Sequence, residues 1–130
     1  MTVYVDTSAA AKLIVDESES PALSAYLDGL VAEGVPLVSG VLRETELRRL
    51  AVRHRLNQAA VSDVLDRFDL FEPDRAIFVE AGLLPGASLR NLDALHIVVA
   101  VRLEADALVT YDVRQTESAQ LVGLRVVAPA

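Results

Sequence analysis

Two aspartates directly follow short apolar runs at opposite ends of the sequence. Asp6 comes after the apolar residues 3–5, and Asp112 comes just after the run 107–110. Each run has the length and the valine content of a buried strand, so each aspartate is expected just beyond the carboxyl end of a strand. In an open parallel sheet the carboxyl ends of the strands lie at one edge, where ligands bind. We therefore expect the two carboxylates at the same edge.

Two further acids can reach this edge from helices. Glu46 lies in a segment of helical periodicity over residues 41–55, which starts directly after an expected strand. Asp93 falls in the first turn of a helix expected over residues 92–104, with Asn91 as its N-cap. The helix starts place both side chains near the edge that carries Asp6 and Asp112.

Four converging carboxylates repel one another unless cations neutralise them. Mg²⁺ and Mn²⁺ prefer oxygen ligands and accept one or two direct carboxylates while retaining several waters. Such ions activate water and stabilise the charge that develops during displacement at a phosphate. The acids thus indicate a site for Mg²⁺ or Mn²⁺ and the hydrolysis of phosphodiester bonds.

The composition limits the other classes of function. With 130 residues the chain fits one domain over residues 1–130. It has no cysteine, which excludes disulfides and zinc–thiolate sites. It has neither a signal peptide nor an apolar run long enough to cross a bilayer, so we expect a cytoplasmic protein without a membrane partner.

The net charge of −7 is unusual for a protein that binds nucleic acid, but the basic residues are unevenly distributed. Five arginines fall within residues 43–55, namely Arg43, Arg48, Arg49, Arg53 and Arg55. They indicate a local basic surface that could contact RNA phosphates or a protein partner, although an exposed helix is often charged for solubility alone.

The apolar pattern predicts an α/β fold. Strands alternating with helices favour a three-layer α/β/α sandwich around a mainly parallel sheet of four to five strands. Strands are expected at residues 3–5, 36–39, 70–72, 107–110 and 124–127, and the last helix at about 116–122.

Four blocks of the sequence resemble PIN-domain ribonucleases of the VapC toxin type. They are VDTSAAAKL at residues 5–13, SGVLRETELRR at 39–49, LDALHIVVA at 92–100 and LVTYDVRQTESAQLVGLRVV at 108–127. Their order and spacing are specific, whereas any one block alone would be weak. The resemblance covers almost the whole chain and implies a PIN-like fold.

The resemblance also implies roles for individual residues. The acidic quartet of the family falls on Asp6, Glu46, Asp93 and Asp112, as catalytic residues and as ligands of Mg²⁺ or Mn²⁺. The hydroxyl groups of Thr7 or Ser8, and of Thr110, would order metal-bound water or the phosphate.

By the same resemblance the protein would be an endoribonuclease, the toxin of a bacterial toxin-antitoxin pair. The implied substrate is a loop of structured RNA, such as tRNA or ribosomal RNA. The implied partners are a second copy of the chain and a small antitoxin whose C-terminal tail covers the acidic cleft. Arg114, close to Asp112, is a further expected contact for RNA or antitoxin.

Two assignments leave alternatives. Glu44 lies near the glutamate position that the resemblance implies, but the family's serine-to-glutamate spacing, read from Ser39, favours Glu46. Two residues apart on a helix, the two side chains point in different directions. His96 follows Asp93 by three residues on the same helical face, yet hard cations favour oxygen. We therefore favour a role for His96 in packing or in supporting a ligand.

Other interpretations compete with a nuclease site. Asp6 could merely cap a helix, and Asp112 could merely stabilise a turn. A Mg²⁺-dependent phosphohydrolase with Asp6 as nucleophile would normally need a second acid two residues later, where this chain has Ser8. A non-catalytic module that binds RNA or protein through its arginines is the other alternative.

Overall fold

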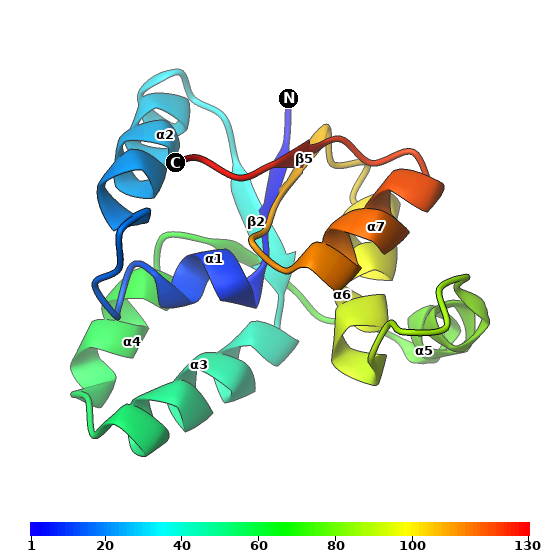
Figure 1. Ribbon diagram of the computed structural model, residues 1–130, viewed down its shortest axis with the longest axis horizontal. Coiled ribbons are helices and arrows are strands. Elements are labelled where there is room, and N and C mark those ends of the chain that lie inside the picture. Colours follow the sequence, from blue (N-terminus) through cyan, green and yellow to red (C-terminus); the bar gives the residue numbers. More distant parts are fainter.

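Strands and helices alternate along the computed structural model, which describes residues 1–130 (Figure 1). The strands are β1 (Val3–Val5), β2 (Leu37–Gly40), β3 (Asp69–Phe71), β4 (Ala107–Val109) and β5 (Val126–Val127). The helices are α1 (Thr7–Ala11), α2 (Ser20–Ala32), α3 (Leu42–His54), α4 (Gln58–Leu65), α5 (Arg75–Leu83), α6 (Asn91–Arg102) and α7 (Val113–Leu121).

The sheet has the strand order β3-β2-β1-β4-β5, and every neighbouring pair is parallel. The chain proceeds from β1 to β2 and β3 on one side and then returns to place β4 on the other side of β1. The strand order therefore reverses between β1 and β4, and in such sheets ligands bind beyond the carboxyl ends at this point. Asp6 follows β1, and its amide nitrogen donates to Val109 O of β4 at 2.9 Å.

Side chains of the central strand alternate between two hydrophobic cores, as the pleat of a strand requires. Val3 and Val5 pack in the core that α1, α2, α3 and α4 cover. Tyr4 points to the opposite face and packs in the core under α5, α6 and α7. Figure 1 shows these two helical layers on either side of the strands, which confirms the predicted three-layer α/β/α sandwich.

Helix α7 begins earlier than the sequence pattern predicts. It starts at Val113 and not near Thr116, because Asp112 takes the N-cap position. Its Oδ1 accepts from the backbone nitrogens of Arg114 and Gln115, at 2.9 and 3.4 Å. The cap fixes Asp112 directly beyond β4.

Helix α6 also starts one residue earlier than predicted. Arg90, with extended backbone, occupies the N-cap position that we assigned to Asn91, which is already helical. Asp93 lies in the first turn, where the positive end of the helix dipole favours an acid. The next residues, 94–100, are all buried, so this turn is firmly held against the sheet.

No helix of the protein is both long enough and apolar enough to cross a membrane.

We predict that Leu27→Ala lowers the free energy of unfolding by about 3 kcal/mol, because Leu27 is completely buried under the sheet and its loss leaves a cavity. Leu83→Ala is the matched control, since Leu83 is 80% exposed and its truncation should change stability by less than about 0.5 kcal/mol. Urea denaturation of both variants measures the difference. Equal losses would contradict the described core.

Candidate active site

The four predicted acids come from four different elements and meet beyond the carboxyl ends of β1 and β4. Asp6 caps α1, Asp112 caps α7, Asp93 lies in the first turn of α6, and Glu46 extends from α3. The alternative interpretation of Asp6 as a helix cap is thus correct, and Asp112, for which the alternative was a turn, also caps a helix. Capping engages only part of each carboxylate, and the same caps aim the groups at the shared edge.

Asp6 is almost completely buried, and hydroxyl groups fix one of its oxygens. Oδ2 accepts from Ser8 Oγ and from Thr110 Oγ1, both at 2.9 Å, and from Ser8 N at 3.3 Å. With its amide nitrogen turned toward Asp6, Gln115 donates to Oδ2 at 3.0 Å and to Oδ1 at 3.2 Å. These donors fix the orientation of Asp6 and leave Oδ1 with a single protein partner, Gln115. Gln115 follows the Asp112 cap by three residues, and no pattern in the sequence predicts its contact with Asp6.

Arg90 lies between two of the aspartates. Its Nε is 3.5 Å from Asp93 Oδ2, and its Nη2 is 3.7 Å from Asp112 Oδ2. Sequence analysis missed Arg90, although its position three residues before Asp93 at a helix start could have indicated the contact. A guanidinium therefore already supplies positive charge at the point where these two acids face each other.

Asp93 carries the clearest sign of electrostatic conflict in the site. Burial raises the pKa of its carboxyl group, and the negative charges of Asp112 and Asp6 raise it further, against the opposing effect of Arg90. Its Oδ2 is buried and makes no hydrogen bond. Apart from the Arg90 guanidinium at 3.5 Å this oxygen has no partner, and a bound cation or an ordered water would satisfy it, because a buried acceptor without a hydrogen bond is costly.

Glu46 reaches the site from the opposite side. Its Oε1 accepts from Thr7 Oγ1 at 3.0 Å and lies 2.5 Å from His96 Nε2. His96 itself is 1% exposed and contacts Tyr4 on its other ring nitrogen. The imidazole therefore lies behind Glu46, in agreement with our preference for a supporting role.

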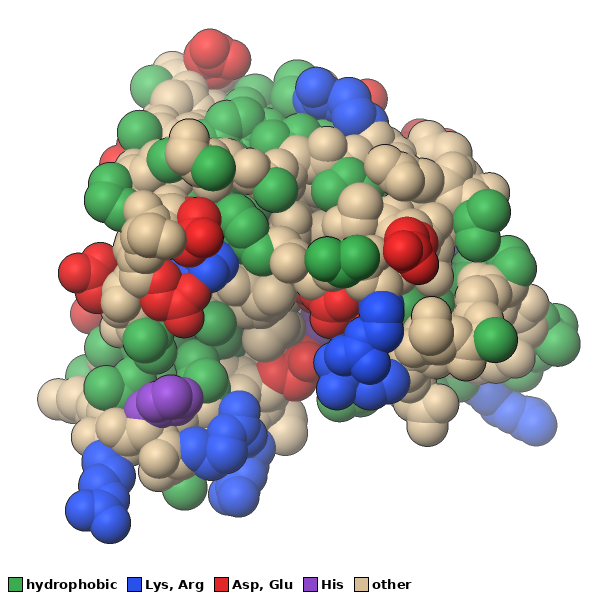
Figure 2. All heavy atoms as spheres, in the orientation of Figure 1, with side chains coloured by type: hydrophobic (Ala, Val, Ile, Leu, Met, Phe, Trp, Pro, Cys, Tyr) green, Lys and Arg blue, Asp and Glu red, His purple; other side chains and the backbone are tan.

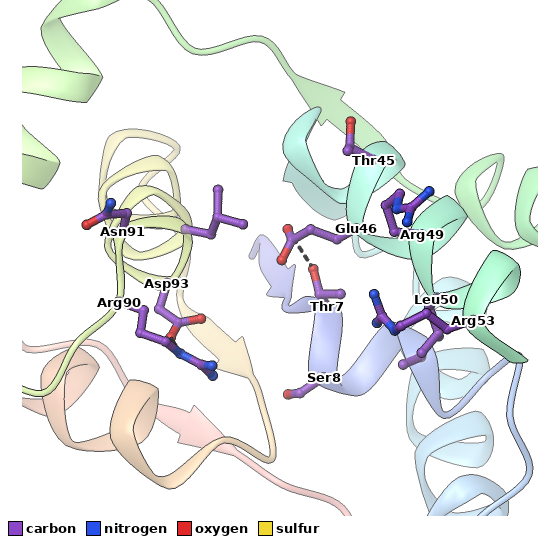
Figure 3. Close-up of a pocket in the computed structure, with 12 residues that line it drawn as sticks. Thr7, Ser8, Thr45, Glu46, Arg49, Leu50, Arg53, Arg90, Asn91 and Asp93 are labelled. Atoms are coloured by element: carbon purple, nitrogen blue, oxygen red, sulfur yellow. Dashed lines mark hydrogen bonds and ion pairs between the residues drawn. The ribbon is translucent and has the colours of Figure 1, made fainter.

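An open cleft of about 830 Å³ lies between α3 and α6. Figure 3 shows Glu46, Arg49 and Arg53 on the α3 side, and Asp93 with Arg90 on the other side. In Figure 2 acidic side chains lie in the hollow of this face, with basic side chains on both sides of it. The lining residues are Thr7, Ser8, Ala11, Thr45, Glu46, Arg49, Leu50, Arg53, Arg90, Asn91, Leu92 and Asp93.

The donor set suits a hard divalent cation. No group of three or more acid or histidine side chains lies close enough together to hold a metal ion, but Mg²⁺ needs only one or two direct carboxylates and keeps water for its other positions. The buried Asp93 Oδ2 has no hydrogen bond, and Asp112 Oδ2 and Asp6 Oδ1 face the same edge. One or two of these oxygens would bind an ion directly and the others would hold its waters, with Glu46 across the cleft.

The arginines that we expected to contact RNA or an antitoxin lie in different environments. Arg49 and Arg53 line the cleft. Arg114 is half-exposed, with its Nε 4.0 Å from Asp112 Oδ1. Arg48 lies outside the cleft, where it pairs with Glu44 at 3.2 Å and donates to side chains of α4. Glu44 is therefore a surface acid on another side of α3 from Glu46.

Arg43 corrects our expectation of a surface contact. It is completely buried, and its guanidinium carbon lies 5.1 Å from the centre of the Phe68 ring. Arg43, Leu47 and Ala51 are spaced four residues apart and form the inner face of α3. This spacing could have revealed the burial, so Arg43 contacts neither RNA nor a partner.

Comparisons with known proteins agree with this geometry. Residues 3–121 match the family model for the PIN domain. The chain is 41% identical over 133 residues to Ribonuclease VapC35 of Mycobacterium tuberculosis, covering 98% of this chain and 96% of the relative. It is 37% identical over 131 residues to Ribonuclease VapC46 of the same organism, covering 98% of both chains.

Solved structures share the fold at low sequence identity. A chain from the crystal structure of VapBC2 from Rickettsia felis, bound to a DNA fragment from their promoter, aligns over 100% of both chains with a TM-score of 0.79 and 17% identity. Mycobacterium tuberculosis VapC20, described as a Sarcin-Ricin loop cleaving toxin, aligns over 98% of this chain and 99% of that chain, with a TM-score of 0.74 and 18% identity. The chain belongs to the PIN domain family.

Proposed function

We propose that this protein is a metal-dependent endoribonuclease and the toxin of a bacterial toxin-antitoxin pair. PIN-domain ribonucleases generally depend on divalent metal ions, and Mg²⁺ or Mn²⁺ would serve here. The observation that carries the proposal is the meeting of Asp6, Asp93 and Asp112 at one edge of a cleft that Glu46 faces. The likeness to ribonucleases VapC35 and VapC46 supports the choice of RNA as substrate.

The side chains of the site have separate tasks in this proposal. Asp93, Asp112, Oδ1 of Asp6 and Glu46 would hold the ion directly or through its waters, while Ser8 and Thr110 orient Asp6. A bound divalent ion would supply a nucleophilic water and stabilise the negative charge that develops on the phosphate. Free carboxylate oxygens at the edge can accept the proton that this water loses.

No other residue is placed to act as a general acid or base in the cleft. His96 is buried behind Glu46, and Lys12 pairs with Glu17 and Glu19 away from the acids. Water and the carboxylates therefore donate and accept the protons of the reaction.

The shape and charge of the cleft favour a flexible RNA segment. Glu46 and Asp93 line the cleft, so the phosphate to be cleaved must enter it, which an unpaired loop of tRNA or ribosomal RNA can do more readily than a stiff duplex. The net charge of −7 repels RNA, and Arg49 and Arg53 supply local attraction along one wall.

Phosphoryl transfer to Asp6 finds less support. Ser8 and Thr110 direct three hydrogen bonds at one oxygen of Asp6, and Gln115 contacts the other. To attack a phosphate, Oδ1 would have to give up its contact with Gln115, and Ser8 stands where this class of enzyme has its second acid. The proposal therefore assigns Asp6 to metal binding.

We also propose two protein partners, a small antitoxin that covers the acidic cleft and a second copy of the chain. The likeness to VapBC2 and to the VapC relatives supports the first, and resemblance to the family supports the second. Coexpression with a candidate antitoxin and analytical ultracentrifugation of the purified chain test them. Failure of the candidate antitoxin to copurify or to protect RNA, or a monomer at all concentrations, would reject the respective partner.

We predict that the purified protein cuts RNA at discrete sites with Mg²⁺ or Mn²⁺ and not with a chelator. Asp6→Asn and Asp93→Asn should each slow cleavage at least about a hundredfold, because the ion contributes several kcal/mol to the transition state. Mapping of fragment ends after incubation with total bacterial RNA measures this. Persistent RNA binding in chelator without any cleavage would favour the binding module, and full activity of either variant would exclude the mechanism.

The two neighbouring glutamates should behave differently. Glu46→Gln removes a charge that faces the cleft and is expected to reduce the cleavage rate by about ten- to a hundredfold. Glu44→Gln only breaks the exposed pair with Arg48 and should leave the rate unchanged. Initial rates on one RNA substrate at several Mn²⁺ concentrations compare them. If Glu44→Gln slowed cleavage more than Glu46→Gln, Glu44 would be the glutamate of the active site.

Arg49 and Arg53 should govern RNA affinity more than chemistry. In the Asp6→Asn background, which leaves RNA intact, replacing both by Gln should weaken binding and reduce the salt slope by about 1.4, as expected for two lost contacts to single-stranded phosphates. Arg125→Gln is the control, because this exposed arginine precedes β5 at the opposite edge of the sheet. Fluorescence anisotropy with labelled RNA at several salt concentrations measures the slope. An equal effect of the control would indicate nonspecific attraction.

A further inference from the structure

A continuous line of hydrogen bonds runs from the central strand to the site through two buried aromatic side chains. The amide nitrogen of Gly40, at the end of β2, donates to Tyr4 Oη at 3.0 Å. Tyr4 Oη lies 2.5 Å from His96 Nδ1, and His96 Nε2 lies 2.5 Å from Glu46 Oε1. Tyr4 and His96 are 0% and 1% exposed, so water does not compete for these contacts.

The direction of each bond follows from the partners. Tyr4 Oη accepts the proton of the Gly40 amide, and its own proton points to His96 Nδ1. Burial raises the pKa of Tyr4 to about 12, so the hydroxyl group retains that proton. His96 Nδ1 is therefore the acceptor, and in a neutral imidazole the proton must lie on Nε2. Nε2–H then donates to the carboxylate of Glu46.

We propose that Tyr4 and His96 are positioning residues for Glu46, with Tyr4 fixing the Nε2–H tautomer of His96 and His96 fixing the rotamer of the glutamate. This inference rests on the proposed function, since it gives Glu46 its place in the site. A ring nitrogen that is held by a second partner commonly sets both the orientation and the basicity of the group it supports.

One carboxylate oxygen of Glu46 is thus held by hydrogen bonds, and the other is free. Thr7 Oγ1 and His96 Nε2 both donate to Oε1, whereas Oε2 accepts no hydrogen bond from the protein. A glutamate on a helix has three rotatable bonds, so without these donors it would sample several rotamers in the open cleft. With them, the carboxylate is held in one orientation, and Figure 3 shows the Glu46 side chain extending from α3 into the cleft on whose other side Asp93 lies.

The first experiment determines the tautomer in the protein without metal or RNA. Long-range ¹H–¹⁵N NMR spectra distinguish the two neutral forms and the imidazolium form of histidine. The chain has two histidines, and the exposed His54 can be replaced by Gln so that only His96 contributes. We expect the Nε2–H form, and in Tyr4→Phe a shift toward the Nδ1–H form. The Nδ1–H form or an imidazolium in the wild-type chain would overturn the inference.

The second experiment measures the effect on Glu46 with Mn²⁺ as the probe. His96→Leu removes the donor and should weaken Mn²⁺ binding by about 10- to 100-fold in calorimetric titration. His96→Gln can still donate through its amide and should retain most of the affinity. A structural role alone would make the two variants equal, and that result would contradict the inference. Circular dichroism confirms that each variant, including Tyr4→Phe, is folded.

Cleavage kinetics separate this inference from the proposed function. In His96→Leu, kcat should fall while KM for RNA is unchanged, because Arg49 and Arg53 are intact. If the wild-type chain cuts RNA but all the His96 variants bind Mn²⁺ equally, the inference fails and the nuclease stands. If His96→Leu binds Mn²⁺ more weakly than His96→Gln but no RNA is cut by the wild-type chain, His96 positions Glu46 and the proposed nuclease reaction is wrong.

Discussion

Mutual repulsion of four carboxylates at one edge of the sheet is the constraint on which the site depends. The fold accepts this repulsion because each of three acids is anchored through one oxygen. Asp6 is held by Ser8 and Thr110, Asp112 by the backbone of α7, and Glu46 by Thr7 and His96. Asp93 Oδ2 accepts no hydrogen bond, and burial together with the negative charges of Asp112 and Asp6 raises the pKa of the Asp93 carboxyl group. A divalent cation bound at this edge would neutralise the negative charges and so remove the repulsion between the carboxylates.

The distribution of charge explains how an acidic protein can act on RNA. Arg90 contacts Asp93 and Asp112 directly, and Arg49 and Arg53 line the cleft beside Glu46, so positive charge is concentrated where a phosphate would enter. The remaining acids keep the rest of the surface negative, which disfavours nonspecific adsorption of nucleic acid. Affinity should therefore depend on the few arginines of the cleft and on the metal.

Periodicity and strand ends were sufficient to predict the sandwich, the parallel sheet and the four acids. The start of α7 was misplaced because a cap by Asp112 is a local hydrogen bond without an apolar signal. The burial of Arg43 was missed because charge was given more weight than the four-residue spacing to Leu47. Gln115 and Tyr4 reach the site only through tertiary contacts, for which the chain order gives no indication.

Thermal unfolding with and without Mn²⁺, in the wild-type chain and in Asp93→Asn, tests the electrostatic origin of the site most directly. Without metal the variant should be at least as stable as the wild type, because it removes a buried carboxylate whose charge is disfavoured. Mn²⁺ should stabilise the wild type, by about 2.7 kcal/mol at a hundred times the dissociation constant, and the variant far less. A metal-free variant that is less stable than the wild type, together with equal stabilisation of both by Mn²⁺, would contradict the account.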